Sequence, residues 1–305
     1  MTFILTEVES PQDIQGRNQL LQETLRPNTQ DFSIEKEYPI ALSPHKFHNC
    51  YSYAFKKDKK IISHANLWKR TITNHHNNKT IDIGLVGNVA TDPKFQGQGI
   101  MKNLLQVVGE KAIDQGLSAL ILWSDLTKFY HKLGFKSWGE EKRYFIESPN
   151  RKKNKKTFYP LLSQNISHKL LESILKLRPR NLTLKRSTDE FRYLLTIPDT
   201  VLMIDDHQNI QSYFIIGKGA DMIGVIHEWG GDPETIIEGV KFIQFKTDAK
   251  LTIVLCPTKI EPYSHQAFLK SSFKVETHPM AMTKIIHEDY ADDLKNLFIW
   301  GLDSI

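Results

Sequence analysis

The chain has 305 residues, of which 40% are hydrophobic and 25% charged, and its formal net charge is +5 at pH 7. This profile excludes an intrinsically disordered chain, and the length exceeds what one small core organises, so we expect two domains. The two cysteines are far apart in sequence and do not form a disulfide framework, which favours a cytoplasmic location. We expect no signal peptide. We also expect no membrane partner, since no apolar run approaches about 20 residues.

The first half predicts alternating strands and helices in a simple order. Residues 3–8 indicate a strand, after which Ser10 caps a helix. Three strands of an antiparallel meander follow at residues 50–55, 61–72 and 81–91. A helix from about Gly97 to Gly116 comes next, then a buried strand at 118–123, a short helix at 126–133 and a strand from Phe135 onward. The predicted fold class is α+β, one mixed, mainly antiparallel sheet flanked by helices.

A basic, proline-containing segment at residues 148–156 predicts a domain boundary. We expect domains at residues 1–147 and 181–305, joined by a linker and connecting helix at 148–180. The helix-like stretch runs from Leu161 to Leu175, and beyond it the earlier order partly recurs. Strands are expected at 200–205, 210–217, 222–229, 251–256 and 280–286, and helices at 233–245 and 265–271. This recurrence predicts an internal duplication of one fold.

The most informative segment runs from Val89 to Met101, where a strand passes through a glycine-bearing turn into an amphipathic helix. The first N–H groups of a helix have no intrahelical partner, and the helix dipole adds positive potential there. This arrangement is typical of a phosphate or pyrophosphate site. We therefore expect a diphosphate-bearing cofactor at this turn.

Two motifs carry a resemblance to a known family. Gln96-x-x-Gly99-x-Met101 resembles motif A of the GNAT superfamily of acetyl-CoA-dependent acyltransferases, Gln/Arg-x-x-Gly-x-Gly/Ala at a helix start, with Met101 in place of the last small residue. Residues 129–135 are similar to the short helix and Gly-Phe corner of motif B, in the family's order and spacing. The resemblance covers roughly residues 1–147 and implies a GNAT-like sheet with acetyl-CoA as co-substrate.

The resemblance also implies roles for individual residues. The strand edge at Val89, Ala90 and Thr91 is expected to pair with the pantetheine arm, with one backbone amide polarising the thioester carbonyl. The N–H groups that hold the diphosphate are expected from Gln96, Gly97, Gln98, Gly99, Ile100 and Met101. A competing dinucleotide fingerprint is disfavoured, because Lys102 stands at its third glycine and the preceding strand belongs to a meander.

Tyr130 stands where the family commonly places a tyrosine that protonates the departing thiolate. A packing role for this aromatic ring is the alternative. The general base is not identified, and Asp82, Asp125 and His64 are weak candidates. The family often carries an asparagine after the fifth strand that contacts the pantetheine, whereas this chain has Ser124 and Asp125 there, so the resemblance does not extend to that contact.

Two other polar clusters favour structural roles. His75 and His76 have no further ligands at useful spacing, so we predict a turn and no metal site. The basic run from Arg151 to Lys156 lacks interleaved aromatic residues, so a solvated linker is favoured and nucleic acid is not expected as a partner. Binding to DNA or RNA through this run would show an affinity that depends steeply on salt concentration.

The second half is expected to be a degenerate GNAT-like copy, as in tandem members of the superfamily. Asp232 at its corresponding turn would repel a diphosphate, so this half would instead wall the acceptor pocket. The apolar tail is expected to be buried, and a sharper hypothesis brings Asp303 to Ile305 to the catalytic cleft, with the terminal carboxylate as base.

The resemblance therefore implies an N-acetyltransferase, and we expect it to act by direct transfer in a ternary complex on a small-molecule or peptide amine. A non-catalytic acyl-CoA sensor is the alternative. Nothing in the sequence selects one amine.

Overall fold

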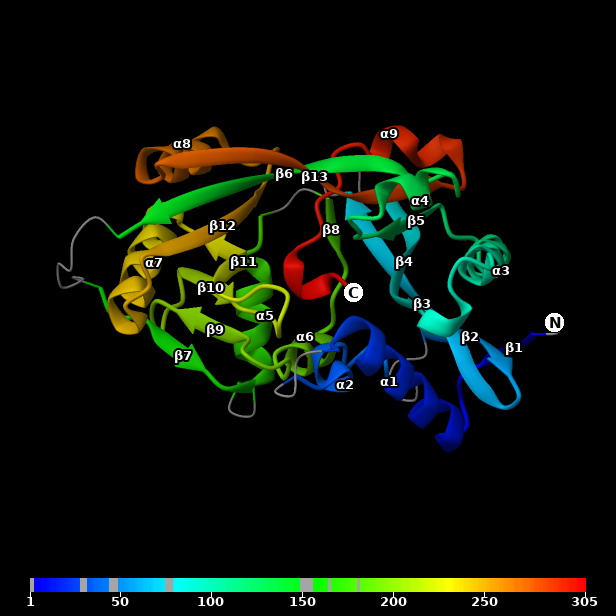
Figure 1. Cartoon of the computed structure of the whole chain (residues 1–305). Coiled ribbons are helices and arrows are strands. Elements are labelled where there is room, and N and C mark those ends of the chain that lie inside the picture. Colours follow the sequence, from blue (N-terminus) through cyan, green and yellow to red (C-terminus); the bar gives the residue numbers. More distant parts are fainter. Residues whose placement is uncertain are drawn as a thin grey trace.

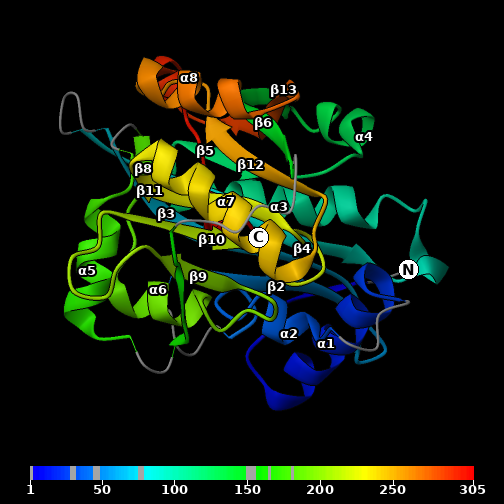
Figure 2. The ribbon, with the colours of Figure 1, turned by 90° about the vertical axis from the view of Figure 1, so that its left-hand side faces the viewer.

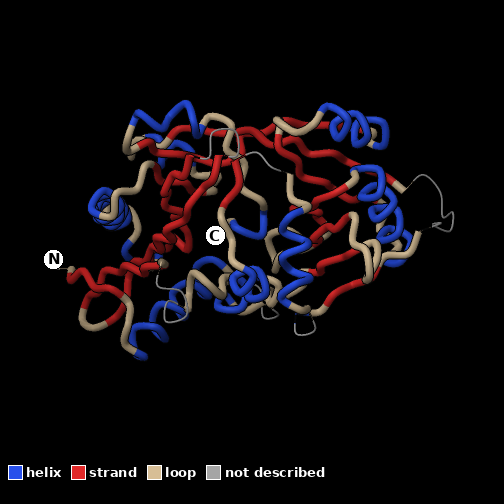
Figure 3. Tube along the Cα trace, turned by 180° about the vertical axis from the view of Figure 1, so that it is seen from behind, coloured by secondary structure: helices blue, strands red, loops and turns tan. Residues whose placement is uncertain are grey.

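The computed structural model of the chain describes residues 3–27, 32–43, 49–74, 79–148, 156–163, 166–179 and 182–305. The strands of these residues form one sheet of 13 strands that passes through the whole molecule (Figure 1, Figure 3). His75, His76 and the basic run from Arg151 to residue 155 lie outside the described residues. None of the helices in the described ranges combines the length and apolar character that crossing a bilayer requires.

The first half of the chain follows the predicted order, with one additional short helix, α2. Its elements are β1 (Ile4–Glu7), α1 (Pro11–Leu25), α2 (Ile34–Glu37), β2 (Cys50–Lys57), β3 (Lys60–Asn74), β4 (Lys79–Thr91), α3 (Ile100–Asp114), β5 (Ala119–Leu122), α4 (Thr127–His131) and β6 (Lys136–Glu147). Ser10 begins α1 as expected, because its side chain accepts a hydrogen bond from the backbone N–H of Asp13 at 3.2 Å. The later helix, α3, begins at Ile100 rather than near Gly97, because Gly97 and Gly99 adopt left-handed φ values of 74° and 76°.

The second half repeats this order with different lengths and with two additional elements, β8 and α9. Its elements are β7 (Tyr159–Leu161), α5 (His168–Lys176), β8 (Leu182–Leu184), α6 (Thr188–Leu194), β9 (Val201–Ile204), β10 (Ser212–Ile216), β11 (Val225–Gly231), α7 (Pro233–Thr247), β12 (Leu251–Pro257), α8 (Pro262–Ser271), β13 (Lys274–Ile285) and α9 (Ala291–Leu294). The helix predicted from Leu161 starts only at His168, because the Ser167 side chain caps it, and Leu161 belongs to β7. The last strand is longer than predicted and begins at Lys274.

The order of strands across the sheet is nearly symmetric between the two halves. It runs β1-β2-β3-β4-β5-β13-β6-β12-β11-β10-β9-β7, with β8 paired to β3. Read from both ends, β4 corresponds to β11, β5 to β12 and β6 to β13. Among the described neighbours, β4 with β5 and β11 with β12 run parallel, and the other pairs are antiparallel. The predicted α+β fold, a mainly antiparallel sheet flanked by helices, is confirmed, and this order agrees with a duplication of one fold.

The two halves exchange strands at the centre of the sheet. β13, from the end of the chain, pairs with both β5 and β6, while β6 pairs with β12 of the second half. One cluster of buried apolar side chains accordingly extends from Trp68 in β3 to Trp300 near the end of the chain. The stretch at 274–285 therefore completes the sheet of the first half.

The helices cover different faces of the sheet. Figure 1 shows α3 and α7 on the two outer sides, while α1, α2, α5 and α6 lie towards the middle with the C-terminal residues between them. Figure 2 shows α7 lying across the strands of the second half. The last residues of the chain are thus enclosed between the inner faces of the two halves.

Candidate functional site

An opening in the sheet lies between β4 and β5. The recorded pairing of these parallel strands consists of Gly84 with Leu120 and Leu85 with Ile121, after which β4 continues to Thr91. On its other side β4 stays paired with β3 as far as Thr91. The last residues of β4 therefore have a strand edge that faces the opening. An extended chain with amide groups can bind along such an edge.

The part of β4 beside this opening contains a bulge. The register with β3 shifts between His64 and Asn66, and Asn88 adopts a φ of 48°, a left-handed value that only a few per cent of non-glycine residues adopt. Beside Asn88, Val89 packs on the α3 face of the sheet and Ala90 on the α1 face. The predicted positions Val89, Ala90 and Thr91 are thus on or next to the bulged edge.

The N-terminus of α3 at Ile100 follows this edge after a short 3-10 helix, Pro93–Phe95, and the turn through Gly97 and Gly99. Gly99 is its N-cap, and no side chain caps the helix. A Cβ atom placed on Gly97 or on Gly99 would meet nothing within 4 Å, so the space in front of these backbone groups is open. Gln96 is turned back, and its Nε2 donates to the carbonyl oxygen of Thr91 at 3.1 Å. A 15-residue helix with uncapped N–H groups in front of open space suits a diphosphate.

A hollow of about 280 Å³ lies beside α3 and α4. Apolar residues, Leu120 and Phe135 among them, line it together with three lysines, Lys102, Lys132 and Lys284, and one carboxylate, Glu110. Lys284 comes from β13, so sequence reasoning on the first half alone missed it. Such a hollow is suited to a ring system that carries an additional phosphate.

Tyr130 on α4 belongs to the same apolar cluster against which Val89 packs. Its ring lies edge-on to Phe129 and Phe135, with centroid distances of 5.0 and 5.7 Å. The residue is only 5% exposed, and burial raises the pKa of its phenol to about 12. At neutral pH this group is protonated and can donate a proton or a hydrogen bond.

The three weak base candidates lie in different places. Asp82 pairs with Lys69 at 2.9 Å near the start of β4, and Asp125 is exposed in the loop after β5. His64 is fully buried, with both ring nitrogens in hydrogen bonds to Ser52 and Asn88. Because its lone pair and its N–H are both engaged, His64 is not placed to take a proton from an acceptor.

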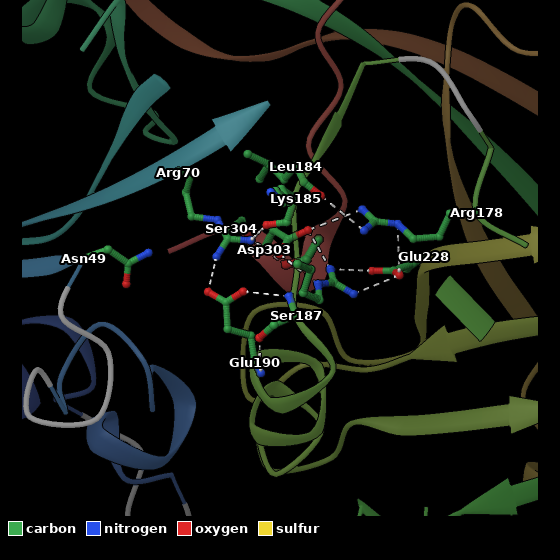
Figure 4. A network of polar contacts seen from close by, with 12 residues as sticks. Asn49, Arg70, Arg178, Leu184, Lys185, Ser187, Glu190, Glu228, Asp303 and Ser304 are labelled. Carbon is green, nitrogen blue, oxygen red and sulfur yellow. Dashed lines mark hydrogen bonds and ion pairs between the residues drawn. The ribbon is translucent and has the colours of Figure 1, made fainter. Parts of the chain in front are cut away.

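The C-terminal segment is fixed by a buried ionic network (Figure 4). The Asp303 carboxylate accepts hydrogen bonds from Arg186 at 3.0 and 2.6 Å and from Arg70 at 3.3 Å. Arg186 also binds Glu228 through two bonds of 3.1 and 2.9 Å, and Arg178 lies 3.5 Å from Asp303. Burial alone would raise the pKa of Asp303, but the charges of these arginines outweigh it and lower the pKa.

The residues after Asp303 reach the opening of the first half. Lys218 from the second half donates to the carbonyl oxygen of Gly301 at 2.7 Å and to the Ser304 hydroxyl at 2.9 Å. A Cβ atom on Gly87 of β4 would come within 2.7 Å of the Ile305 carbonyl carbon. The structure thus brings the tail to β4, whereas its role as a base remains a prediction.

The corresponding position in the second half is closed. By strand register, Glu228 stands where β4 has Gly87, and Trp229 stands where it has Asn88. The Trp229 indole N–H donates to the carbonyl oxygen of Leu255 in β12 at 3.0 Å and so bridges the gap between the strands. Asp232 caps α7 with its own side chain, which accepts from the Thr235 N–H at 2.9 Å.

Comparisons with known proteins identify a matching family model and similar folds. Residues 10–137 match the family model described as "Acetyltransferase (GNAT) domain". A comparison with curated proteins found no match. A conserved protein of Enterococcus faecalis V583 has a TM-score of 0.69 and 15% identity, covering 94% of this chain and 73% of that one.

Two further solved structures are similar over nearly the whole chain. The GCN5-related N-acetyltransferase of Kribbella flavida has a TM-score of 0.67 and 11% identity over 96% of this chain and 74% of that one. That of Anabaena variabilis ATCC 29413 has a TM-score of 0.66 and 16% identity over 96% and 75%. At these identities the likeness concerns the fold.

Proposed function

We propose that the chain acetylates a primary amine with acetyl-CoA, because residues 10–137 match the model of the GNAT acetyltransferase domain, whose chemistry is acyl transfer. One observation carries the proposal: the edge of β4 that β5 leaves unpaired is followed, after one short 3-10 helix and a glycine turn, by the uncapped N-terminus of α3. Amides of the edge would pair with the pantetheine arm, and those of Gln96 to Met101 would hold the diphosphate. The three lysines of the neighbouring hollow would attract the remaining phosphate.

The reaction requires a neutral amine, a polarised carbonyl and a proton for the leaving group. Acetyl-CoA supplies the thioester. The amine nitrogen attacks its carbonyl carbon, the C–S bond breaks, the nitrogen loses a proton to a base, and Tyr130 donates its phenolic proton to the thiolate. A backbone amide of the β4 bulge would stabilise the oxyanion, which usually provides the largest single contribution in acyl transfer. We propose direct transfer in a ternary complex, because Cys50 and Cys256 are both buried and burial raises the pKa of both thiols.

We propose that the second half walls the acceptor site. Three polar contacts join it to α1 and the region around α2: Arg26 pairs with Asp221 at 2.8 Å, Tyr38 donates to Asp221 at 2.5 Å, and the Ala220 N–H donates to Glu37 at 2.5 Å. The acceptor would be a small-molecule or peptide amine that enters between the halves. We place the reaction in the cytoplasm, where reduced cysteines are stable.

The test combines binding with turnover. Calorimetry with coenzyme A should give one site per chain, because the second opening is bridged by Trp229, and thiol release from acetyl-CoA should appear with at least one member of a panel of amines. Tight binding without turnover for any amine would instead support the sensor alternative. A folded protein that gave no heat with coenzyme A would overturn both.

A further inference from the structure

A buried row of polar groups connects α1 to the bulge of β4. Arg17 of α1 lies 3.4 Å from the Ser52 hydroxyl, Ser52 lies 2.7 Å from Nε2 of His64, and Nδ1 of His64 lies 2.8 Å from the carbonyl oxygen of Asn88. Arg17, Ser52 and His64 are each at most 1% exposed. The function proposed above uses none of these three side chains, although the row ends at its acyl site.

The two ends of the row fix the position of every proton in it. A carbonyl oxygen can only accept, so Nδ1 of His64 carries the hydrogen that binds Asn88. A guanidinium can only donate, so the Ser52 hydroxyl accepts from Arg17 and donates to Nε2. Burial, followed by the charge of Arg17, lowers the pKa of His64 to about 3, so the ring is neutral. His64 is therefore held as one tautomer that donates to β4.

The peptide that His64 binds is the one that joins Asn88 to Val89. In a trans peptide the C=O and N–H groups point in opposite directions, and no peptide bond among the described residues is cis. Since the Asn88 carbonyl points to the His64 ring, the Val89 N–H points away from that ring, in a part of β4 that has no recorded pairing with β5. A donor at the carbonyl oxygen withdraws electrons from the peptide, which makes its N–H a stronger donor.

We propose that His64 is a positioning residue for acyl transfer: it fixes the Asn88–Val89 peptide in the bulge and polarises the Val89 N–H, which binds the thioester oxygen. The inference rests on the proposed function and narrows its oxyanion donor to one amide. His64 also holds Asn88 at a left-handed φ, a conformation that needs support from its surroundings. This positioning role replaces the role of general base for which the sequence made His64 a candidate.

Two substitutions at His64 separate donation from packing. In His64→Asn the side-chain N–H₂ can occupy the place of Nδ1–H, so the bond to Asn88 is kept while the bond to Ser52 is lost. In His64→Leu both bonds are lost and an apolar side chain fills the space. We expect kcat to fall about tenfold in His64→Leu, less than the ~10²-fold that follows removal of an oxyanion donor itself, and to be largely retained in His64→Asn.

Vibrational spectroscopy reads the polarisation directly. With carbonyl-labelled acetyl-CoA bound and no amine present, we expect the thioester C=O band below its frequency in water for the natural protein and for His64→Asn. In His64→Leu the band should move back towards its value in water, while the Kd for coenzyme A without an acetyl group stays within about twofold. Thermal unfolding establishes that both variants are folded.

The outcomes distinguish this inference from the proposed function. If the natural protein binds and turns over acetyl-CoA but His64→Leu leaves kcat and the C=O band unchanged, His64 has no positioning role. If acetyl-CoA does not bind at all, the proposed function fails and this inference with it. Nitrogen NMR of the natural protein supplies a measurement that requires no variant: a ring with hydrogen on Nδ1 from pH 5 to 9 is expected, and hydrogen on Nε2 would overturn the proposal.

Discussion

Gly87 of β4 lies directly against the main chain of Ile305, so closely that a Cβ atom on Gly87 would stand 2.7 Å from the Ile305 carbonyl carbon. The two residues are far apart in sequence, yet this contact brings the tail to the opening between β4 and β5. Residue 87 must therefore be a glycine for the tail to occupy this position. The contact ties the sheet edge of the first half to the segment that the buried arginines hold.

Substitution of Gly87 tests what this contact contributes. Gly87→Ala should displace the tail, because the new methyl group meets backbone atoms that cannot rotate away. We expect kcat to fall by roughly 10- to 100-fold, the scale on which misplacement of about 1 Å acts, while the Kd for coenzyme A changes little. Steady-state kinetics and calorimetry measure the two quantities.

A second glycine supplies the control for Gly87→Ala. Gly16 lies in α1, and a Cβ atom there would make ordinary contacts of 3.9 and 4.0 Å with Ile61. Gly16→Ala should therefore leave kcat unchanged and stabilise the helix by up to about 1 kcal/mol. Full activity in Gly87→Ala would show that the tail has no part in the reaction.

The ionic network around Asp303 predicts a particular dependence of stability on pH. The arginines lower the pKa of Asp303 from its ordinary 3.8, so the unfolded chain takes up this proton first as the pH falls. The contribution of Asp303 to stability is complete above about pH 4 and is lost progressively below it. Asp303→Asn should cost about 3–5 kcal/mol at pH 7, because it leaves buried arginine charge uncompensated.

Urea unfolding of both proteins between pH 7 and pH 3 measures this effect. The difference in unfolding free energy between the natural chain and Asp303→Asn should shrink as the pH falls towards 3. Asp114→Asn is the control, because Asp114 forms an exposed pair with Lys111 at 3.9 Å and should change stability by less than about 0.5 kcal/mol. A constant difference across the pH range would contradict the predicted linkage.

Local sequence signals predicted most of the first half. Ser10 marks the start of α1 because a cap acts within its own turn, and the alternation of Ile81, Ile83 and Leu85 indicated β4 because successive side chains of a strand point to opposite faces. The turn through Gly97 and Gly99 was found for the same reason, since left-handed φ values leave a direct trace in residue type. The position of Tyr130 came from the resemblance to motif B.

Long-range pairing left no comparable trace in the sequence. Nothing in the residues of β13 indicates that it pairs with both β5 and β6, so the exchange of strands and the place of Lys284 beside α3 were missed. The bond between Arg70 and Asp303 spans 233 positions of the chain. Such contacts are set by topology, and one sequence without relatives does not display them.

Two glycines at opposite ends of α3 provide a matched test of the diphosphate site. Gly99 before the helix and Gly116 after it have φ values of 76° and 68°, and a Cβ atom on either would meet nothing within 4 Å. Alanine at either position should therefore cost the same backbone strain, about 1 kcal/mol. Only Gly99→Ala should also weaken coenzyme A binding, because its methyl group enters the space expected for the diphosphate.

Calorimetry measures the affinity of the two variants for coenzyme A, and thermal unfolding measures their stability. We expect the Kd to rise at least tenfold in Gly99→Ala and to stay within about twofold in Gly116→Ala, since tenfold corresponds to about 1.4 kcal/mol. Equal affinities in two equally destabilised proteins would place the diphosphate elsewhere.

Removal of the Tyr130 hydroxyl tests the proton donor. Tyr130→Phe keeps the ring contacts with Phe129 and Phe135, so the fold should be retained. We expect kcat to fall by about 10²-fold with little change in KM, because the donor acts on a group that develops charge only as the C–S bond breaks. Tyr144→Phe is the control, since it removes a phenol that binds His265 at 2.6 Å in the second half and should leave kcat unchanged.

The pH profile separates Tyr130 from a donor of ordinary acidity. Because burial raises its pKa to about 12, the phenol stays protonated well beyond the range in which an exposed tyrosine ionises. We therefore expect that ionisation of Tyr130 does not lower kcat of the natural chain at any pH up to about 10. Any decline in kcat within this range should accordingly remain in Tyr130→Phe. A limb near pH 9 that vanishes in Tyr130→Phe would mean that the phenol titrates in the site as an exposed group does, and the assignment of a buried proton donor would then be wrong.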